Sequence, residues 1–192
     1  MNPTDFEKII YTVNDGVALV TLDNPERRNA WGGRMSVEYR WALHHAHTDT
    51  DVRVVVVTGG GKDFCVGADS QDLKTIEESG GNYQKAKLEL PPYPEGTPET
   101  FQRNHAYPLS ISTPIIAAVN GACAGVGFLV ASYADFRFGA TNNKIKSSFA
   151  RLGLPAEYGL GWLLPRMMGR ANALQILLDG DRIDGQEALR LG

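Results

Sequence analysis

The sequence predicts an α/β protein, and three observations carry that prediction. First, residues 52–57 (VRVVVV) and 115–119 (IIAAV) are short and almost wholly apolar, the pattern of strands covered on both faces of a sheet. Second, each of these runs enters a glycine-rich loop that is followed by a stretch with helical character. Third, the chain has 192 residues and is 43% hydrophobic, which suits one globular domain. We therefore predict a single domain over residues 1–192.

The N-terminal part begins with a predicted hairpin. Residues 7–22 (EKIIYTVNDGVALVTL) contain two β-rich runs around Asn-Asp-Gly, a strong hairpin signal. A turn-rich stretch follows, and apolar side chains at helical spacing then predict a helix over 35–47. After the strand at 52–57 and its glycine loop, a polar, helix-like stretch begins at Ser70.

The second part repeats the order of strand, glycine loop and helix. Residues 80–98 contain four prolines and predict a long loop, of the kind that often closes over a site. The strand at 115–119 leads through a glycine turn into a helix from about residue 125, and DFRFGA (135–140) predicts another strand. Three helical segments fill 157–191. We place the core at about 5–155 and a helical segment at about 156–192.

Composition excludes several classes of function. The net charge is −3, acids and bases are well mixed, and the absence of a basic cluster argues against a nucleic-acid partner. Residues 114–134 are nearly uncharged and long enough to span a membrane, but Asn120-Gly121 and two further glycines break the run. We expect no membrane association. The first twenty residues alternate charge and apolarity and contain no signal peptide, which predicts a cytoplasmic protein.

The cysteines and histidines give no metal signature. Cys65 and Cys123 lie in apolar surroundings without CxxC or Cys/His spacing, so we predict small buried side chains in a reducing compartment. Three of the four histidines share one helical stretch and are predicted to be solvated, while the fourth stands alone: His44, His45, His47 and His105. None of them has ligand spacing. No metal, flavin or nicotinamide is predicted.

The two glycine loops point to a binder of carbonyl or anionic oxygen. A helix N-terminus exposes free backbone N–H groups, and glycine lets a ligand approach them closely. The loop at 58–69 (TGGGKDFCVGAD) lacks the spacing of a phosphate-binding P-loop, and GACAGVGF (121–128) lacks the third glycine of a dinucleotide site. No G-x-S-x-G nucleophile motif occurs. What remains is one N–H donor in each loop, able to hold a thioester or carbonyl oxygen.

Four ordered motifs resemble those of the enoyl-CoA hydratase/isomerase (crotonase) superfamily. They are LDNPERRNAW (22–31), VVVVTGGGKDFCVGAD (54–69), PIIAAVNGACAGVGF (114–128), and LGLPAEYGLGWLLPR (152–166) leading to ALQILLDGDRIDGQEALRLG (173–192). The resemblance covers the whole chain. It implies a crotonase-like spiral of repeated ββα units, followed by a shortened C-terminal helical segment. It also implies an acyl-CoA thioester substrate, no cofactor beyond that coenzyme A, and a homotrimer or a dimer of trimers.

The resemblance assigns two peptide N–H groups to an oxyanion hole for the thioester oxygen. By motif position these belong to Ala68, which follows Gly67, and to Val126, which follows Gly125. Valine stands where the family usually has glycine. Only the backbone N–H is needed there, although the larger side chain narrows the hole.

The resemblance also assigns the surroundings of the substrate. Arg28, Asn29 and Ala30 fall in the stretch along which the nucleotide and pantetheine of coenzyme A lie. Val66, Ala68 and Asp69 fall where the family lines the thioester end of the substrate.

Glu157 is the predicted catalytic acid/base. Hydratases of the family use two glutamates, whose positions here are Leu129 and Phe149, so the two-glutamate water site is predicted to be absent. Other members place a single acid shortly beyond an LG pair, where Glu157 falls. Taken alone, Glu157 is better explained as an acid at the start of a helix. The family context favours catalysis, with Tyr158 and Trp162 expected to shield the carboxylate from water.

The predicted activity is that of a lyase or isomerase of fatty acid metabolism. A single carboxylate suits the shift of a double bond along an enoyl-CoA, and hydration with Glu157 alone is the close second. Thioester hydrolysis or decarboxylation on the same oxyanion hole is an alternative, since a fold does not fix the chemistry. A catalytically silent CoA-binding subunit is another, because both hydratase glutamates are missing.

Overall fold

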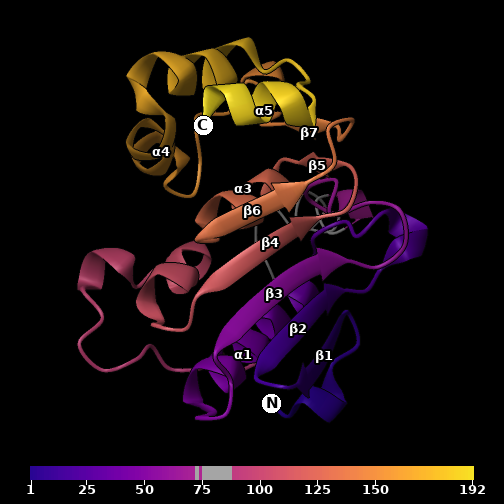
Figure 1. Ribbon diagram of the computed structural model, residues 1–192, viewed down its shortest axis with the longest axis vertical. Coiled ribbons are helices and arrows are strands. Elements are labelled where there is room, and N and C mark those ends of the chain that lie inside the picture. Colours follow the sequence, from indigo (N-terminus) through magenta and orange to yellow (C-terminus); the bar gives the residue numbers. More distant parts are fainter. Residues whose placement is uncertain (72–73, 75–87) are drawn as a thin grey trace.

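A five-stranded sheet lies at the centre of the computed structural model (Figure 1). The structure describes residues 1–71, 74 and 88–192. The strand order is β1 (Ile9–Asn14), β2 (Val17–Leu22), β3 (Val54–Gly59), β4 (Ile115–Val119) and β6 (Phe136–Gly139). β1 pairs antiparallel with β2, and the other neighbouring strands are parallel. A second, two-stranded parallel sheet joins β5 (Cys123–Ala124) to β7 (Ile145–Lys146).

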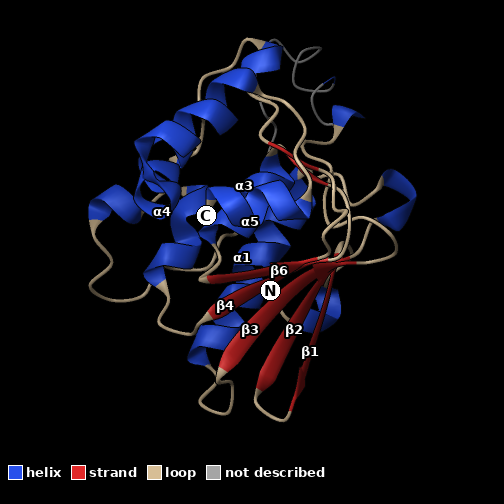
Figure 2. Ribbon diagram, turned by 45° about the horizontal axis from the view of Figure 1, so that its top comes forward, coloured by secondary structure: helices blue, strands red, loops and turns tan. Residues whose placement is uncertain are grey.

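Helices cover one face of the sheet and extend beyond its β6 edge. The α-helices are α1 (Gly33–Thr48), α3 (Val126–Tyr133), α4 (Leu160–Leu174) and α5 (Gly185–Leu191), with a π-helical stretch at Gln175–Asp179. Short 3-10 turns lie at Pro3–Asp5, Pro25–Arg27, Glu99–Phe101, Asn104–Ser110 and Ala150–Leu152. Figure 2 shows α1 and α3 on the same side of the sheet. In Figure 1, α4 and α5 lie past β6.

The N-terminal hairpin forms as predicted. Asp15 and Gly16 connect β1 to β2 with positive φ angles of 48° and 75°. Two consecutive residues with positive φ are typical of the tight turn whose twist matches that of the two strands, and Asp-Gly is a favoured pair for it. The turn fixes the register in which Asn14 lies opposite Val17.

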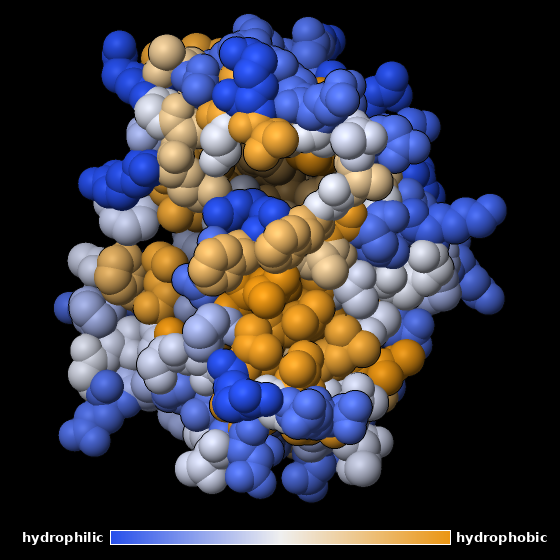
Figure 3. Space-filling view, in the orientation of Figure 1, coloured by the Kyte–Doolittle hydropathy of each residue, from blue (hydrophilic) through white to orange (hydrophobic). Residues whose placement is uncertain are grey.

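Side-chain alternation along the parallel strands separates an inner face from an outer one. Val55 and Val57 of β3 are buried against the helices, as are Ile115 and Ala117 of β4. The register sets Leu19, Val56, Ile116 and Phe136 side by side on the opposite face. No helix of the described residues covers that face, and Figure 3 shows a continuous apolar patch there. Phe136 and Phe138 are 58% and 64% exposed.

Most predicted elements are confirmed. The strands expected at 52–57 and 115–119 correspond to β3 and β4, and α1 and α3 occupy the expected helical stretches. The break between the first two C-terminal segments falls at Gly169, whose φ of 76° and ψ of 160° are not helical. The helix expected from Ser70 and the start of the 80–98 loop lie largely outside the described residues. Residues 88–98 contain no helix or strand.

The predictions for cysteine hold and those for three histidines do not. Cys65 and Cys123 are buried free thiols. His44, His45 and His47 are half-buried rather than solvated, because the N-terminus and the Asn104–Ser110 turn pack against α1. His45 Nε2 donates to the Met1 carbonyl oxygen at 2.8 Å, and His44 Nδ1 lies 3.3 Å from the Tyr107 hydroxyl.

The apolar run at 114–134 forms β4, β5 and α3 rather than one long helix. Within the described parts of the chain, no helix combines the length and the apolar character needed to cross a membrane.

Candidate active site

The two glycine loops meet backbone to backbone. A Cβ on Gly125 would lie 3.4 Å from the Cα of Gly67, and a Cβ on Gly67 would lie 3.3 Å from the carbonyl oxygen of Ala124. Both glycines have positive φ, 108° at Gly67 and 51° at Gly125. Glycine is required at both positions for this approach and for this backbone conformation. The residues that follow are Ala68 and Val126, whose role as a pair of oxyanion donors stays a prediction.

Both predicted oxyanion donors have a free N–H. Among the described residues, neither the Ala68 nor the Val126 peptide N–H donates to a backbone or side-chain acceptor. Val126 is the first residue of α3, so its N–H has no partner within the helix and lies at the positive end of the helix dipole. Ala68 is exposed and Val126 is buried.

The loop that carries Ala68 is held from both sides. The Trp31 N–H donates to the Gly67 carbonyl oxygen at 2.7 Å, and the Asp69 N–H donates to the Trp31 carbonyl oxygen at 3.0 Å. On the other side, the Ala124 N–H donates to the Cys65 carbonyl oxygen at 2.9 Å. The loop is thus a short strand between two backbone segments, which orients its N–H groups before any ligand binds.

Two of the predicted substrate-binding residues, Asp69 and Arg28, form ion pairs with residues outside the predicted set. Asp69 is buried, and its carboxylate accepts from Arg27 Nε at 2.9 Å and from Arg27 Nη2 at 2.5 Å. Arg28 is exposed and donates to both carboxylate oxygens of Asp63. This contact lowers the pKa of Asp63, with the Arg28 hydrogen bond as the main cause. Ala30 is buried and Val66 is half-buried.

Asn29 organises the turn between these residues. Its side chain is fully buried, accepts from the Asn24 N–H at 2.9 Å, and donates to the carbonyl oxygens of Gly60 and Asp63 at 2.9 and 2.8 Å. Arg28 and Asn29 both have positive φ. The amide therefore stabilises a backbone conformation that presents Arg28 outward.

A small cavity lies behind the oxyanion loops, between α1, the Asn104–Ser110 turn and α3. Its volume is about 10 Å³, about the space that one water molecule needs. The lining residues are Trp31, Ser36, Tyr39, Arg40, His105, Pro108, Leu129, Val130 and Tyr133. Leu129, at the position of the first hydratase glutamate, is thus a wall of the cavity and is 1% exposed. Burial, reinforced by Arg40, lowers the pKa of His105 to about 4.

The second hydratase position is apolar and buried as well. Phe149 is 5% exposed, and its carbonyl oxygen accepts from the N–H groups of Leu152 and Leu154. Both Leu129 and Phe149 therefore belong to the hydrophobic core. A carboxylate pair that positions water does not exist at these two positions.

Glu157 lies in a strained turn before α4. It is half-buried, and its neighbours Tyr158 and Gly159 have positive φ angles of 55° and 84°. The prediction that Tyr158 and Trp162 shield its carboxylate from water is wrong, because both side chains are 44% exposed. Within the described residues no hydrogen bond or ion pair joins the Glu157 carboxylate to either oxyanion loop. The hydrogen bond between this turn and α3 is made by the Tyr158 carbonyl oxygen, which accepts from the Tyr133 hydroxyl.

Other chemistry finds no support around these loops. Burial raises the pKa of Cys65 to about 12 and that of Cys123 still further, so both remain protonated thiols rather than nucleophiles. Among the residues that the structure describes, no group of three His, Cys, Asp or Glu side chains is placed to hold a metal ion.

The family follows from comparison with known sequences. The sequence model described as enoyl-CoA hydratase/isomerase matches residues 12–192. The chain belongs to the enoyl-CoA hydratase/isomerase family. A Rhodobacter capsulatus protein named "Probable enoyl-CoA hydratase" is 36% identical over 187 residues, which are 97% of this chain and 67% of that protein. The 1,2-epoxyphenylacetyl-CoA isomerase of Escherichia coli is 32% identical over 189 residues, 97% of this chain and 68% of that protein.

Solved structures agree with the fold. The crystal structure of an enoyl-CoA hydratase from Polaromonas sp. JS666 superposes with a TM-score of 0.76 at 32% identity, covering 96% of this chain and 68% of that one. The crotonase-like fold expected from the four motifs is therefore confirmed. The predicted division into a core and a helical segment, and the predicted site residues, stay predictions.

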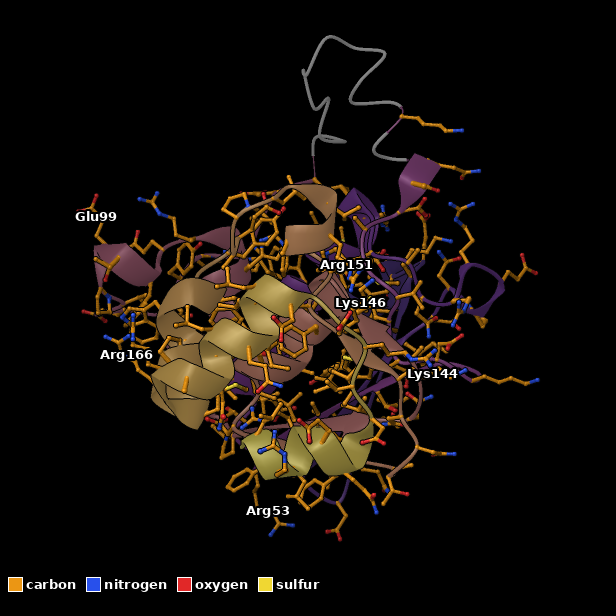
Figure 4. All side chains as sticks on the ribbon, turned by 90° about the horizontal axis from the view of Figure 1, so that it is seen from above. Arg53, Glu99, Lys144, Lys146, Arg151 and Arg166 are labelled. Atoms are coloured by element: carbon orange, nitrogen blue, oxygen red, sulfur yellow. The ribbon has the colours of Figure 1, made fainter. Side chains whose placement is uncertain are left out.

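Sequence reasoning missed two features of this family member's site. The Tyr133 hydroxyl donates to the Tyr158 carbonyl oxygen at 2.6 Å, and no spacing in the sequence indicates that contact. The second feature is a pair of backbone contacts to the β7 segment. The Gly125 N–H donates to the carbonyl oxygen of Lys146 at 3.1 Å, and the Cys123 N–H donates to the carbonyl oxygen of Lys144 at 2.9 Å. Figure 4 shows both lysines on one side of the C-terminal helices, with Glu99 and Arg166 on the opposite side.

Proposed function

We propose that the chain acts on an acyl-CoA thioester, holds the thioester oxygen with the Ala68 and Val126 N–H groups, and moves a proton with Glu157. The observation that supports the proposal is the close approach of Gly67 to Gly125, the residues directly before Ala68 and Val126, whose N–H groups have no acceptor among the described residues. Charge develops on a thioester oxygen when a proton leaves the neighbouring carbon. Donors placed in advance stabilise that charge, and removing one such donor typically costs about 10²–10³ in rate.

The favoured reaction is migration of a double bond. The Glu157 carboxylate takes a proton from C2 of a 3-enoyl-CoA, and the C2–H electron pair moves into a dienolate whose charge rests on the thioester oxygen. Glu157 then returns the same proton to C4, and the double bond lies between C2 and C3. No atom is gained or lost. One carboxylate serves both steps, because it alternates between base and acid.

Two further observations support isomerisation over hydration. The residues at both hydratase glutamate positions, Leu129 and Phe149, are buried and apolar, so neither can activate water. One relative at 32% identity is named as an isomerase of an acyl-CoA. Hydration with Glu157 alone is the second candidate, supported by the relative at 36% identity that carries a hydratase name.

The rest of the proposal concerns binding and assembly. Coenzyme A enters as part of the substrate, with its nucleotide and pantetheine along Arg28 and Ala30 and its thioester end against Val66, Gly67 and Asp69. The proposal adds no cofactor and assigns the enzyme to fatty acid metabolism in the cytoplasm, where Cys65 and Cys123 stay reduced. A homotrimer or a dimer of trimers is the proposed assembly, which sedimentation at several concentrations tests.

The decisive experiment offers the purified chain trans-2- and trans-3-enoyl-CoA thioesters of four to ten carbons and follows the products by chromatography and mass. An isomerase shifts the double bond without a change of mass, and a hydratase adds one water. Release of free coenzyme A or of carbon dioxide would instead indicate the hydrolase or decarboxylase alternative. Retained CoA binding without any product would indicate a silent subunit and contradict the proposal.

Glu157→Gln tests the acid, with Glu99→Gln as the matched control. Both variants replace a glutamate by its neutral amide, but Glu99 is exposed and its side chain points outward at the edge of the molecule in Figure 4. We expect Glu157→Gln to lose turnover and to keep its affinity for coenzyme A, whereas Glu99→Gln keeps both. Equal turnover in the two variants would remove Glu157 from the mechanism.

A further inference from the structure

One side chain ties the Glu157 turn to the helix that begins with Val126. Tyr133 is the last residue of α3, and its hydroxyl donates to the Tyr158 carbonyl oxygen at 2.6 Å. The tyrosine ring is 6% exposed. The bond fixes the peptide that directly follows the Glu157–Tyr158 pair. It therefore acts on the backbone that carries the proposed acid.

The turn needs such a contact because its backbone is strained. Tyr158 has a φ of 55°, which is uncommon for a bulky side chain, and Gly159 follows with a φ of 84°. A Cβ on Gly159 would lie 2.5 Å from the Tyr133 hydroxyl oxygen. The absence of a side chain at Gly159 is thus what lets the hydroxyl approach the turn.

Tyr133 lies on the face of α3 that also lines the small cavity. Long side chains on a helix lean back toward its N-terminus, here toward Val126. Leu129 and Val130, on the same face of α3, line the cavity together with Tyr133. The helix is a rigid element of two turns, with an oxyanion donor at its first residue and the hydroxyl that holds the acid's turn at its last.

A second contact holds Tyr158 from its side-chain end. The His105 ring lies against the Tyr158 ring, with centroids 4.1 Å apart. Burial raises the pKa of Tyr133, so its hydroxyl remains a donor across the working pH range. Tyr158 is thus fixed at its carbonyl by Tyr133 and at its ring by His105.

We propose that Tyr133 is a positioning residue, which holds the Glu157 carboxylate at the correct place relative to the Val126 N–H through its hydrogen bond to Tyr158. This inference rests on the proposed function. A shift of about 1 Å in the position of a catalytic group can lower the rate about 10²-fold. Loss of this one hydroxyl should therefore lower turnover.

The test compares Tyr133→Phe with Tyr11→Phe. Each variant removes one hydroxyl from a tyrosine, but the Tyr11 hydroxyl is buried without a hydrogen-bond partner among the described residues and lies on β1, at the far edge of the sheet. With the panel of enoyl-CoA thioesters, we expect Tyr133→Phe to lower kcat about 10- to 100-fold and to change KM less than about twofold. Tyr11→Phe should stay within about twofold of the parent in both.

A double-mutant cycle with Glu157→Gln shows whether Tyr133 acts through the acid. In the Glu157→Gln background, Tyr133→Phe should cost nothing further. An equal loss in both backgrounds, or no loss in the parent, would overturn the positioning role while the proposed function stands. If Glu157→Gln keeps full turnover, or the parent converts no thioester, the proposed function fails and the positioning role fails with it.

Amide hydrogen exchange gives a readout that is independent of turnover. Exchange in residues 152–160 should be faster in Tyr133→Phe than in Tyr11→Phe, and unchanged exchange would overturn the inference. If Tyr133→Phe does not fold, Gly159→Ala attacks the same hydrogen bond from the turn, since its methyl group displaces the hydroxyl. The same fall in kcat is then expected.

Discussion

The Arg27 guanidinium holds the Asp69 carboxylate in a two-pronged contact, with Nε and Nη2 each donating to one carboxylate oxygen. The pair joins the turn after β2 to the residue that follows Ala68. Because the Asp69 side chain is only 11% exposed and the Arg27 side chain 35%, the contact is better shielded from solvent than an ordinary surface pair. It fixes one side of the loop that contains Ala68, the proposed oxyanion donor.

We expect Asp69→Asn to weaken both the loop and the binding of acyl-CoA. One charge-assisted partner is lost, so the free energy of unfolding should fall by about 1–3 kcal/mol and KM should rise. Urea unfolding and steady-state kinetics measure the two effects. Asp181→Asn is the control, because the Arg151–Asp181 pair is exposed and should contribute less than about 1 kcal/mol. Equal effects of the two substitutions would contradict this reading of the Asp69 contact.

Gly125→Ala should separate catalysis from folding. The added methyl group would make only ordinary van der Waals contact with the Cα of Gly67, at 3.4 Å. The φ of 51° and ψ of −116° at Gly125 disfavour any side chain, however, so the backbone that carries the Val126 N–H must shift. We expect kcat to fall about 10²–10³-fold, the cost of losing one oxyanion donor. Gly96→Ala is the control, with a φ of 79° and no atom within 4 Å of the new Cβ. A similar loss in Gly96→Ala would show that backbone strain in general, and not the loop contact, sets the rate.

Glu38→Ala should be among the most destabilising single changes. Its carboxylate is fully buried and accepts from the N–H groups of Glu7 and Lys8 at 2.8 and 2.7 Å, and from Arg34. Removing it leaves these donors without an acceptor, which we expect to cost about 2–4 kcal/mol in urea unfolding. Glu26→Ala, at an exposed position, should change stability by less than about 0.5 kcal/mol. A small effect at Glu38 would mean that water replaces the lost acceptor.

The free energy of unfolding should decrease as the pH is lowered through a window set by the pKa of His105. Burial lowers its folded-state pKa to about 4, against an ordinary value of 6.5. Between these values the unfolded chain binds a proton that the folded chain excludes, so the contribution is complete above pH 6.5 and is lost as pH drops toward 4. We expect a loss of about 3 kcal/mol across the window, because each pKa unit corresponds to about 1.4 kcal/mol. His105→Phe should flatten this part of the profile, and an unchanged slope would assign it to another group, such as His44, whose pKa is also lowered.

Local patterns were sufficient for the elements that local chemistry determines. Asp-Gly fixes the first hairpin through its two positive φ angles, and the apolar run of β4 was placed to the residue. The two short strands β5 and β7 were missed, since a two-residue strand has no periodicity to detect.

The site depends on contacts between distant residues, which single-sequence patterns do not encode. Ala68 and Val126 are predicted as donors from the family motifs, whereas the approach of Gly67 to Gly125 appears only in the structure. The apolar letters around Glu157 suggested an enclosed carboxylate. The positive φ of Tyr158 instead turns that stretch so that Tyr158 and Trp162 are nearly half exposed.

The uncovered face of the sheet has a practical consequence at the bench. Phe136 and Phe138 expose two phenyl rings to solvent on the edge strand β6. Beside them lies a row of aliphatic side chains formed by Leu19, Val56 and Ile116. Surfaces of this kind make molecules adhere to one another and to plastic as concentration changes. The turnover number of this chain should therefore be measured over a series of protein concentrations, with light scattering recorded on the same samples to detect association.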